Sequence, residues 1–502
     1  MFRVLVLLAA IFASNAAFAQ GFVLSGVKFS ESAYLDEDEL QEIAASVVDR
    51  TVVFSDLQAM IAEVQALYST AGVVTARAIL PPQEIRDGIL RVDLIEAIVS
   101  RVTLDGFERT KPEFVERTIS LQAGELPDFE RLEKDLRIYD ISHDLTPLLT
   151  FEAGDEPGTT VAVISVTEPR KFSWTASADN FGTDATGIYR GTLFGRWASV
   201  TGVRDTLSSQ LQVSEGSLSG SLGYSRPVGA GGGRMIGTLS YAENEIVQGV
   251  FEQVDVLSNS LTGSLSYRRP LRVRPFSHVV LDVGIAGEQS TSTIEGEAFS
   301  DVTLAEFVLQ ATYARQFDRA VWSTTLGIKA GSSDAKNTSE TEGEYYLAFG
   351  ALSYTRNFSD KVMMDLNLEA QYAHGENLPI ARLFSAGGAT SVRGYPNNIR
   401  GGDSGAVMKV QVSPVHPYEL ESMKNTSISP FAFFDAAIVV PYRIDGSINE
   451  TQDYLASVGG GLRVDWNQKA SALLMVGFPL IETLGFEDLS ESTVYVGLDY
   501  KF

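Results

Sequence analysis

The sequence predicts two small mixed α+β domains followed by a transmembrane antiparallel β-barrel of about 16 strands. Helical and strand-like segments alternate over residues 21–169, whereas residues 170–502 hold repeated segments of alternating apolar and polar residues separated by Gly, Asn, Asp and Ser. The N-terminus adds a third observation, an export signal. An exported chain without a membrane-spanning helix is either soluble or a barrel.

Residues 1–19 have the three parts of a cleaved secretory signal. Arg3 supplies a positive charge, Val4–Phe12 is an unbroken apolar run, and Ala17-Phe18-Ala19 is a small-x-small cleavage site. The run is too short to span a bilayer, which takes about 20 residues. We therefore expect the mature chain to begin at Gln20.

The composition excludes several function classes. The formal net charge of −25 argues against a nucleic-acid partner, and the absence of Cys excludes disulfides, thiolate metal sites and a catalytic thiol. Gly402-Asp403-Ser404-Gly405 is similar to the nucleophile segment of a serine protease, but the four histidines lie in unrelated contexts. We expect no catalytic residues, no metal and no cofactor.

The first small domain is predicted over residues 20–96 with the order β-α-α-β-β. Asp36 is expected to cap the first helix, and Ser55 with Gln58 to form a capping box on the second, which ends at Gly72. Its strands are expected near 22–29, 73–80 and 89–96.

The second domain, predicted over residues 97–169, repeats that order. Thr110 with Glu113 is expected to box a short helix, and Asp128 to cap the next. Its strands are expected near 97–104, 145–152 and 160–167. Two copies fall below the usual minimum of three for a solenoid, so they indicate two tandem domains.

The barrel is predicted from strand periodicity over residues 170–502. In Val362–Tyr372 the even-numbered positions are apolar and most odd-numbered ones are polar, and the last strand alternates up to the terminal aromatic Phe502, a C-terminal strand signal. A soluble sandwich also alternates, but it rarely needs segments this long or this many. At roughly 20 residues per strand and connection, the region provides about 16 strands.

One stretch, residues 384–405, breaks the alternation. It reads Phe-Ser-Ala-Gly-Gly-Ala-Thr-Ser-Val-Arg-Gly-Tyr and continues to Gly402-Asp403-Ser404-Gly405. This stretch resembles the barrel-lumen loop motif of the outer-membrane assembly and transport superfamily, and within it the two-partner secretion transporters of the hemolysin and filamentous-hemagglutinin type. The motif residues are Gly387, Gly388, Val392, Arg393, Gly394 and Tyr395.

The resemblance implies that the two small domains are POTRA domains in the periplasm of a bacterium and that the barrel lies in its outer membrane. It further implies a transporter that secretes a partner exoprotein without ATP, with outer-membrane lipids around the barrel and the barrel-assembly machinery inserting it. An assembly factor of the same superfamily is the alternative, although such factors usually carry three or more POTRA units. A passive porin would need neither POTRA domains nor the loop.

The family pattern also places a carboxylate for Arg393 on an inner strand, and Pro430–Asp435 matches it. Strand parity turns Phe431, Phe433 and Asp435 inward. An exposed loop arginine with a solvated aspartate is the alternative. Gln411 stands roughly where the family often has an inward Glu, and its role is open.

Members of the family often carry an N-terminal plug helix. Here the first strand is expected to start at Phe22, almost at the predicted cleavage site. We therefore expect the loop alone to limit resting flow through the barrel.

Overall fold

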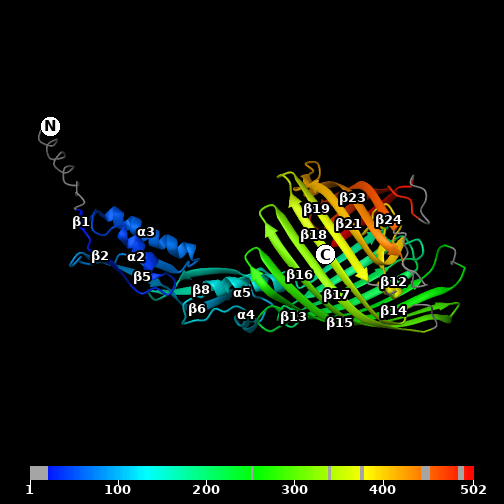
Figure 1. The fold of residues 1–502 in the computed structure, drawn as a ribbon, viewed down its shortest axis with the longest axis horizontal. Helices are drawn as coiled ribbons and strands as arrows, with labels where there is room; N and C mark the ends of the chain where they lie inside the picture. The colour runs from blue at the N-terminus through cyan, green and yellow to red at the C-terminus, as the bar shows by residue number, and fades with distance from the viewer. Residues whose placement is uncertain (1–20, 250–252, 337–340, 374–377, 442–452, 484–490) are drawn as a thin grey trace. The chain divides into compact units, whose positions relative to one another are not determined.

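The computed structural model describes residues 21–249, 253–336, 341–373, 378–441, 453–483 and 491–502, so the predicted signal peptide lies outside the described residues. The chain forms two compact units (Figure 1). Residues 108–118 and 134–146 belong to the same unit as the barrel.

The first domain has the predicted order. Its main elements are β2 (Gly26–Phe29), α2 (Glu37–Ala45), α3 (Phe54–Thr70), β4 (Ala76–Ile79) and β5 (Ile89–Glu96), and two short strands, β1 (Phe22–Val23) and β3 (Thr51–Val52), pair with each other. The sheet order is β2-β5-β4, with β2 parallel and β4 antiparallel to β5. The apolar stripe of α3 packs with both sheet and α2 in one buried core.

The caps of these helices were predicted in part. Asp36 caps α2 by accepting a hydrogen bond from the Asp38 amide, and Gly72 follows α3 with φ +74°. The Ser55–Gln58 capping box is wrong, because the N-cap residue, two residues before Ser55, is the extended Val53. The carboxylate of Asp56, three residues on, then accepts from the Val53 amide.

The second domain repeats the topology with β6 (Ile98–Asp105), α4 (Pro112–Thr118), α5 (Phe129–Ser142), β7 (Leu148–Ala153) and β8 (Thr159–Ser165). Its sheet order is β6-β8-β7, with β6 parallel and β7 antiparallel to β8. Asp128 caps α5 as predicted, but the Thr110 box is wrong because the Thr110 hydroxyl donates to Glu168 instead. Among the described helices, none is long and apolar enough to cross a membrane.

Ion pairs explain why parts of the second domain group with the barrel. Arg204, in the turn after β10, is 1% exposed and donates through Nε to Asp144 at 2.7 Å, while its Nη1 lies 3.8 Å from Glu168. Arg234 donates to the Ser142 carbonyl beside His143. Burial, with the nearby charge of Arg234, lowers the pKa of His143 to about 3, so this ring is neutral at physiological pH.

Sixteen antiparallel strands in the described residues form a closed barrel, in which β26 pairs with β9. The strands are β9 (Phe172–Asp179), β10 (Arg190–Ala198), β11 (Thr206–Val213), β12 (Ser217–Val228), β13 (Gly233–Glu245), β14 (Val256–Arg274), β15 (Ser277–Ile294), β16 (Glu297–Phe317), β17 (Ala320–Lys336), β18 (Gly343–Asn357), β19 (Val362–Ala373), β21 (Arg400–Pro414), β23 (Thr426–Pro441), β24 (Asp453–Trp466), β25 (Ala470–Pro479) and β26 (Thr493–Lys501). Two short strands also pair with barrel strands: β20 (Phe384–Ala386) pairs with β21, and β22 (Tyr418–Glu419) pairs with β23. The predicted fold class is confirmed.

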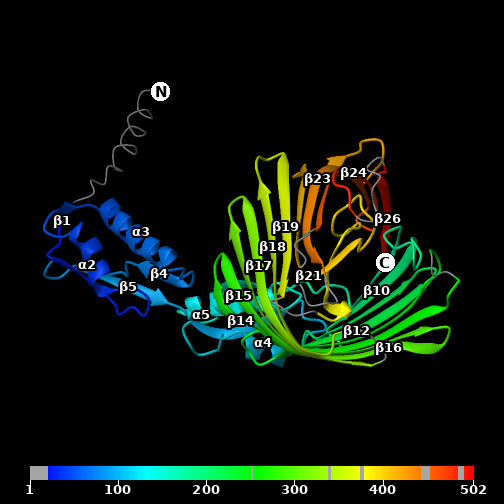
Figure 2. The same ribbon diagram turned by 45° about the vertical axis from the view of Figure 1, so that its right-hand side comes forward.

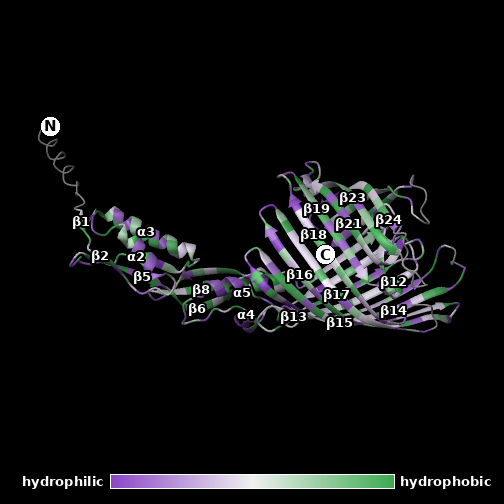
Figure 3. Cartoon of the chain, in the orientation of Figure 1, coloured by the Kyte–Doolittle hydropathy of each residue, from purple (hydrophilic) through white to green (hydrophobic). Residues whose placement is uncertain are grey.

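The two faces of the barrel wall differ as strand parity predicts. Figure 3 shows hydrophobic and hydrophilic residues alternating along the strands. Outward-facing apolar residues are exposed, among them Leu265, Ile285 and Leu326, whereas inward positions include the buried carboxylates Glu306 and Asp435. Phe502 follows β26, donates its amide to the Trp174 carbonyl of β9 and stacks edge-on with Tyr500. This chain end therefore helps to close the seam between the last and first strands.

Candidate functional site

The motif loop lies within the barrel (Figure 2). β20 pairs with the start of β21, and residues 387–399 between them pack against the inner wall. The loop ends earlier than the expected 384–405, because Arg400 begins β21 and Gly402–Gly405 are strand residues. A Cβ on Gly402 would lie 1.7 Å from the Val440 carbonyl oxygen, so glycine serves strand packing here rather than a turn.

Glycines shape the loop itself. Gly387, Gly388 and Gly394 have φ values of +113°, +94° and +107°, a region that side-chain-bearing residues rarely adopt. A Cβ on Gly394 would lie 3.0 Å from the Gly477 carbonyl carbon in β25. Gly394 therefore lets the loop backbone touch the backbone of the wall.

Arg393 and Asp435 are brought together by the structure. Arg393 donates from Nε to Asp435 Oδ2 and from Nη2 to Oδ1, both at 2.7 Å, and its backbone amide donates to Oδ2 at 3.1 Å. Asp435 is 0% and Arg393 8% exposed. The remaining Nη1 donates to Gln411 Oε1 at 3.0 Å, which gives Gln411 a contact that the sequence left open. A planar guanidinium suits such a fork better than an ammonium group.

The two inward phenylalanines of β23 lie next to this pair. The Arg393 guanidinium carbon is 3.6 Å from the ring centroid of Phe433, a cation–π distance, and the Phe431 ring lies 6.5 Å from that of Phe433. The strand motif thus supplies an acid and an aromatic platform for the same arginine.

Tyr395 and Val392 fix the loop on either side of Arg393. Tyr395 is buried, and its hydroxyl donates to the Ile481 carbonyl at 2.7 Å and accepts from the Ile481 amide at 3.1 Å. Val392 is buried in a small apolar cluster with residues of β21, β23 and β24. These contacts give both motif residues anchoring positions.

Two further contacts reach the strands that close the barrel. The Gly394 amide donates to the Tyr495 hydroxyl on β26 at 3.0 Å. The Asn397 side chain donates to the carbonyls of Phe181 and Gly182, which follow β9, at 2.7 and 2.5 Å. Neither Tyr495 nor Asn397 was predicted from the sequence.

A second arginine anchors the segment that leads into the loop. Arg382, in the 3-10 helix η1 (Ile380–Arg382), donates from Nε to Glu306 on β16 at 2.7 Å and from Nη1 to Glu288 on β15 at 2.9 Å. The Tyr345 hydroxyl on β18 donates to the same Glu306 oxygen at 2.8 Å. Its ring lies over Gly331, where a Cβ would be 2.5 Å away. The sequence analysis missed this cluster, although an inward acid such as Glu306 within an alternating strand was a visible signal.

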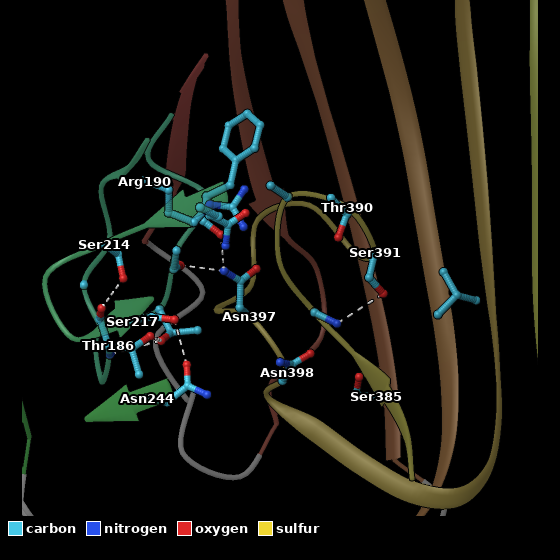
Figure 4. Close-up of a pocket in the computed structure, with 18 of the residues that line it drawn as sticks. Thr186, Arg190, Ser214, Ser217, Asn244, Ser385, Thr390, Ser391, Asn397 and Asn398 are labelled. Carbon is cyan, nitrogen blue, oxygen red and sulfur yellow. Dashed lines mark hydrogen bonds between the residues drawn. The ribbon is translucent and has the colours of Figure 1, made fainter. Parts of the chain in front are cut away.

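A polar cavity of about 450 Å³ lies between the loop and the wall near β10–β13 (Figure 4). Its lining is dominated by hydroxyl and amide side chains: Thr186, Ser214, Ser217 and Asn244 on the wall, and Ser385, Thr390, Ser391 and Asn397 on the loop. The Arg190 side chain on its edge is paired with Asp179 at 2.8 Å. Glu369 and Lys409 also line the cavity and pair with each other at 3.6 Å. The cavity therefore offers polar, hydrogen-bonding groups rather than an apolar surface.

A closed barrel with an arginine-anchored loop on its inner wall and tandem β-α-α-β-β domains ahead of it defines a POTRA-containing outer-membrane barrel. The family model "Haemolysin secretion/activation protein ShlB/FhaC/HecB" matches residues 158–464, and the model "POTRA domain, ShlB-type" matches residues 22–97. The chain belongs to the haemolysin secretion/activation protein family. The predicted family and the outer-membrane location, with periplasmic POTRA domains, are confirmed.

Relatives and solved structures agree with this assignment. The heme/hemopexin transporter protein HuxB of Haemophilus influenzae is 31% identical over 180 residues, 35% of this chain and 32% of HuxB; the outer membrane transporter CdiB of Dickeya dadantii is 22% identical over 176 residues, 35% and 31% of the two chains. These matches span about a third of each relative's length.

The solved structures cover far more of the chain. CdiB from Escherichia coli is similar with a TM-score of 0.74 at 17% identity, covering 98% of this chain and 92% of that one. BamA from Haemophilus ducreyi lacking POTRA domains 1–3 gives 0.55 at 14% identity, covering 96% and 100%. At these identities the similarity establishes the fold.

Proposed function

We propose that the protein recognises a partner exoprotein in the periplasm and secretes it through the barrel. The observation that carries the proposal is the loop: it is held in the lumen by side-chain contacts to the wall and borders a polar cavity. Membership of the haemolysin secretion/activation family supports the same role. The transport role needs no enzymatic step.

Recognition is proposed to take place at a sheet edge of the POTRA domains. Within the first sheet, β4 is an edge strand, and Ile79 at its end is 38% exposed. An extended segment of the exoprotein can add to such an edge through main-chain hydrogen bonds, which do not depend on a particular side-chain sequence.

Passage is proposed along the polar side of the loop. Hydroxyl and amide groups can form hydrogen bonds with any peptide backbone. No particular segment of the unfolded exoprotein therefore binds so tightly that passage stops. The Arg393 loop shifts or stays aside while the chain passes. Folding of the exoprotein outside the cell then supplies the direction without ATP.

Assembly of other barrels is the second candidate, because the fold of BamA covers 96% of this chain. The two candidates differ in what fails when the protein is lost. A secretion transporter leaves unrelated outer-membrane proteins at normal levels, whereas loss of an assembly factor lowers several of them together.

The test removes the first POTRA domain, residues 22–96, and measures secretion of a co-expressed candidate exoprotein that carries an N-terminal secretion domain. Residues 108–146 stay, because deleting them would leave Arg204 buried without Asp144. We expect a folded, heat-modifiable barrel that no longer secretes, with unrelated barrels at normal levels. Normal secretion by this variant would contradict recognition by the first domain, and depletion of unrelated barrels in a null strain would favour assembly.

A further inference from the structure

Four alternate strands of the barrel carry the same pattern, Tyr-x-Arg, near their last residues. The pairs are Tyr224/Arg226 in β12, Tyr267/Arg269 in β14, Tyr313/Arg315 in β16 and Tyr354/Arg356 in β18. These strands all end at the periplasmic edge, where β9 begins directly after the POTRA domains. The pattern therefore marks one edge of one side of the barrel.

Both members of each pair face the lipid. They share parity with exposed apolar residues of the same strands, such as Leu222 in β12, Leu265 in β14 and Phe307 in β16. The inward positions between them face the lumen, as the Arg268–Asp282 pair does.

The depth of these residues fits the membrane interface. In β18, the outward residues Tyr346 and Tyr354 are eight residues apart, which at about 3.3 Å per residue and a tilt of about 40° is about 20 Å along the membrane normal. An apolar band is about 25 Å tall and is bordered by aromatic residues. Arg356 lies about 5 Å beyond Tyr354, at headgroup depth.

Further arginines join this edge in β14. Arg274, Ser277 and Arg315 are consecutive partners across β14, β15 and β16, so Arg274 and Arg315 lie two strands, about 10 Å, apart. Arg272 pairs with Val279, opposite the outward Tyr313. Arginine side chains at this spacing can converge on one phosphate.

The guanidinium groups are oriented but not neutralised. Arg315 lies 4.7 Å from the ring centroid of Phe317, and Arg356 lies 5.6 Å from that of Phe358. Stacking on a ring leaves the N–H edge free to donate. Within the described part of the chain, neither arginine forms an ion pair with a carboxylate, and the same is true of Arg269, Arg272 and Arg274.

The opposite end of the same outward face has the reverse charge. Its outward acids are Glu243, Glu245, Asp301, Asp334 and Glu344, with one base, Lys336. In a protein of net charge −25, a cluster of five arginines with no ion-pair partner among the described residues is a local reversal of sign.

We propose that Arg269, Arg272, Arg274, Arg315 and Arg356, here called the basic rim, bind the phosphates of anionic phospholipids in the periplasmic leaflet. A phospholipid fits because its acyl chains lie on the apolar band while its phosphate reaches the rim just below. An acidic soluble protein or free phosphate would use only half of this surface. Arginine donates to phosphate oxygens through two N–H groups, and basic clusters next to a bilayer bind anionic headgroups.

The test uses the full-length protein in nanodiscs of equal parts phosphatidylglycerol and phosphatidylethanolamine, with native mass spectrometry of the lipids that stay bound. The variant is R274Q/R315Q/R356Q. The control R77Q/R91Q/R101Q changes charge equally on exposed arginines of the POTRA domains. Each rim arginine is worth about fivefold in affinity for an anionic surface. We expect wild type and control to retain phosphatidylglycerol preferentially and the rim variant to lose at least about tenfold of that preference.

Three results would overturn the proposal: equal retention of both lipids by wild type, unchanged preference in the rim variant, or displacement of phosphatidylglycerol by inorganic phosphate. Heat-modifiable mobility on gels checks that each variant is a closed barrel. Should the triple variant not fold, Arg315→Gln alone is compared with Arg91→Gln, and an equal preference in these two would also overturn it.

Discussion

Two arginines hold the same loop, and they do so in different ways. Arg393 binds one carboxylate through both of its oxygens, stacks on Phe433 and is backed by Gln411. Arg382 bridges two carboxylates on two different strands, Glu288 and Glu306. The first arrangement fixes one point of the loop on β23, whereas the second ties neighbouring strands β15 and β16 to the loop. Losing the first should free the loop, and losing the second should place two like charges side by side.

The largest effect is expected from removing the part of the loop that both arginines position. Deleting Thr390–Asn398, which spares β21, should sharply raise single-channel conductance in planar bilayers, because a 16-stranded barrel otherwise leaves a channel. The matched control deletes Glu421–Lys424 in the turn after β22. Wild-type conductance in the loop deletion would mean that another part of the chain fills the lumen.

Arg393→Ala and Asp435→Ala should come next. Breaking a buried pair costs about 3–5 kcal/mol, and lumen water lowers that value here. We expect both variants to lose secretion while the barrel still assembles, and a charge swap to restore part of it. Arg463→Ala, another inward arginine, is the control; full secretion by Arg393→Ala would refute the importance of the pair.

Arg382→Ala should have a smaller effect on secretion than Arg393→Ala and a clearer effect on the stability of the barrel. It leaves Glu288 and Glu306 facing each other without their cation, so we expect lower heat resistance of the folded band on gels, by several degrees. Arg382→Lys keeps the positive charge but cannot bind carboxylates on two strands as the guanidinium does. Its heat resistance should therefore lie between those of the wild type and Arg382→Ala. Equal heat resistance in all three proteins would show that the cluster adds nothing to the barrel.

The smallest effect is expected for Gln411→Ala, which removes one hydrogen bond to a charged group, worth about 1.5–3 kcal/mol before water replaces it. Conductance fluctuations of the channel should rise while secretion is nearly unchanged. Gln411→Glu adds a second carboxylate beside Arg393 and should suppress those fluctuations. A loss of secretion as large as that of Arg393→Ala would contradict this prediction and show that Gln411 is as important as Asp435 for holding Arg393.

The contrast between the two arginines also shows what a sequence can and cannot predict. Asp435 was found because the family resemblance implies a carboxylate on that strand and strand parity turns Asp435 inward. Arg382 was missed because its partners are 76 and 94 residues away and meet it only through strand register and the path of the loop. The capping boxes at Ser55 and Thr110 failed for a related reason: an extended Val53 shifted one helix start, and Glu168, 58 residues away, took the Thr110 hydroxyl. Local periodicity is enough to predict the strands. Polar contacts between distant residues cannot be predicted in this way, because they depend on strand register in the assembled barrel.

Residues 394–397 bind both strands at the seam, and this has a consequence for the order of folding. Ser177 and Asp499, which bond across the seam, are 322 residues apart in sequence, whereas Asn397 lies 216 residues from Phe181 and Gly394 lies 101 from Tyr495. Contacts between distant segments form late because the intervening chain must be closed first. Asn397 contacts Phe181, which follows β9, and Gly394 contacts Tyr495 on β26. These two regions become neighbours only when the first and last strands pair. We therefore expect seating of the loop and completion of the barrel to be a single late event in the folding of this chain.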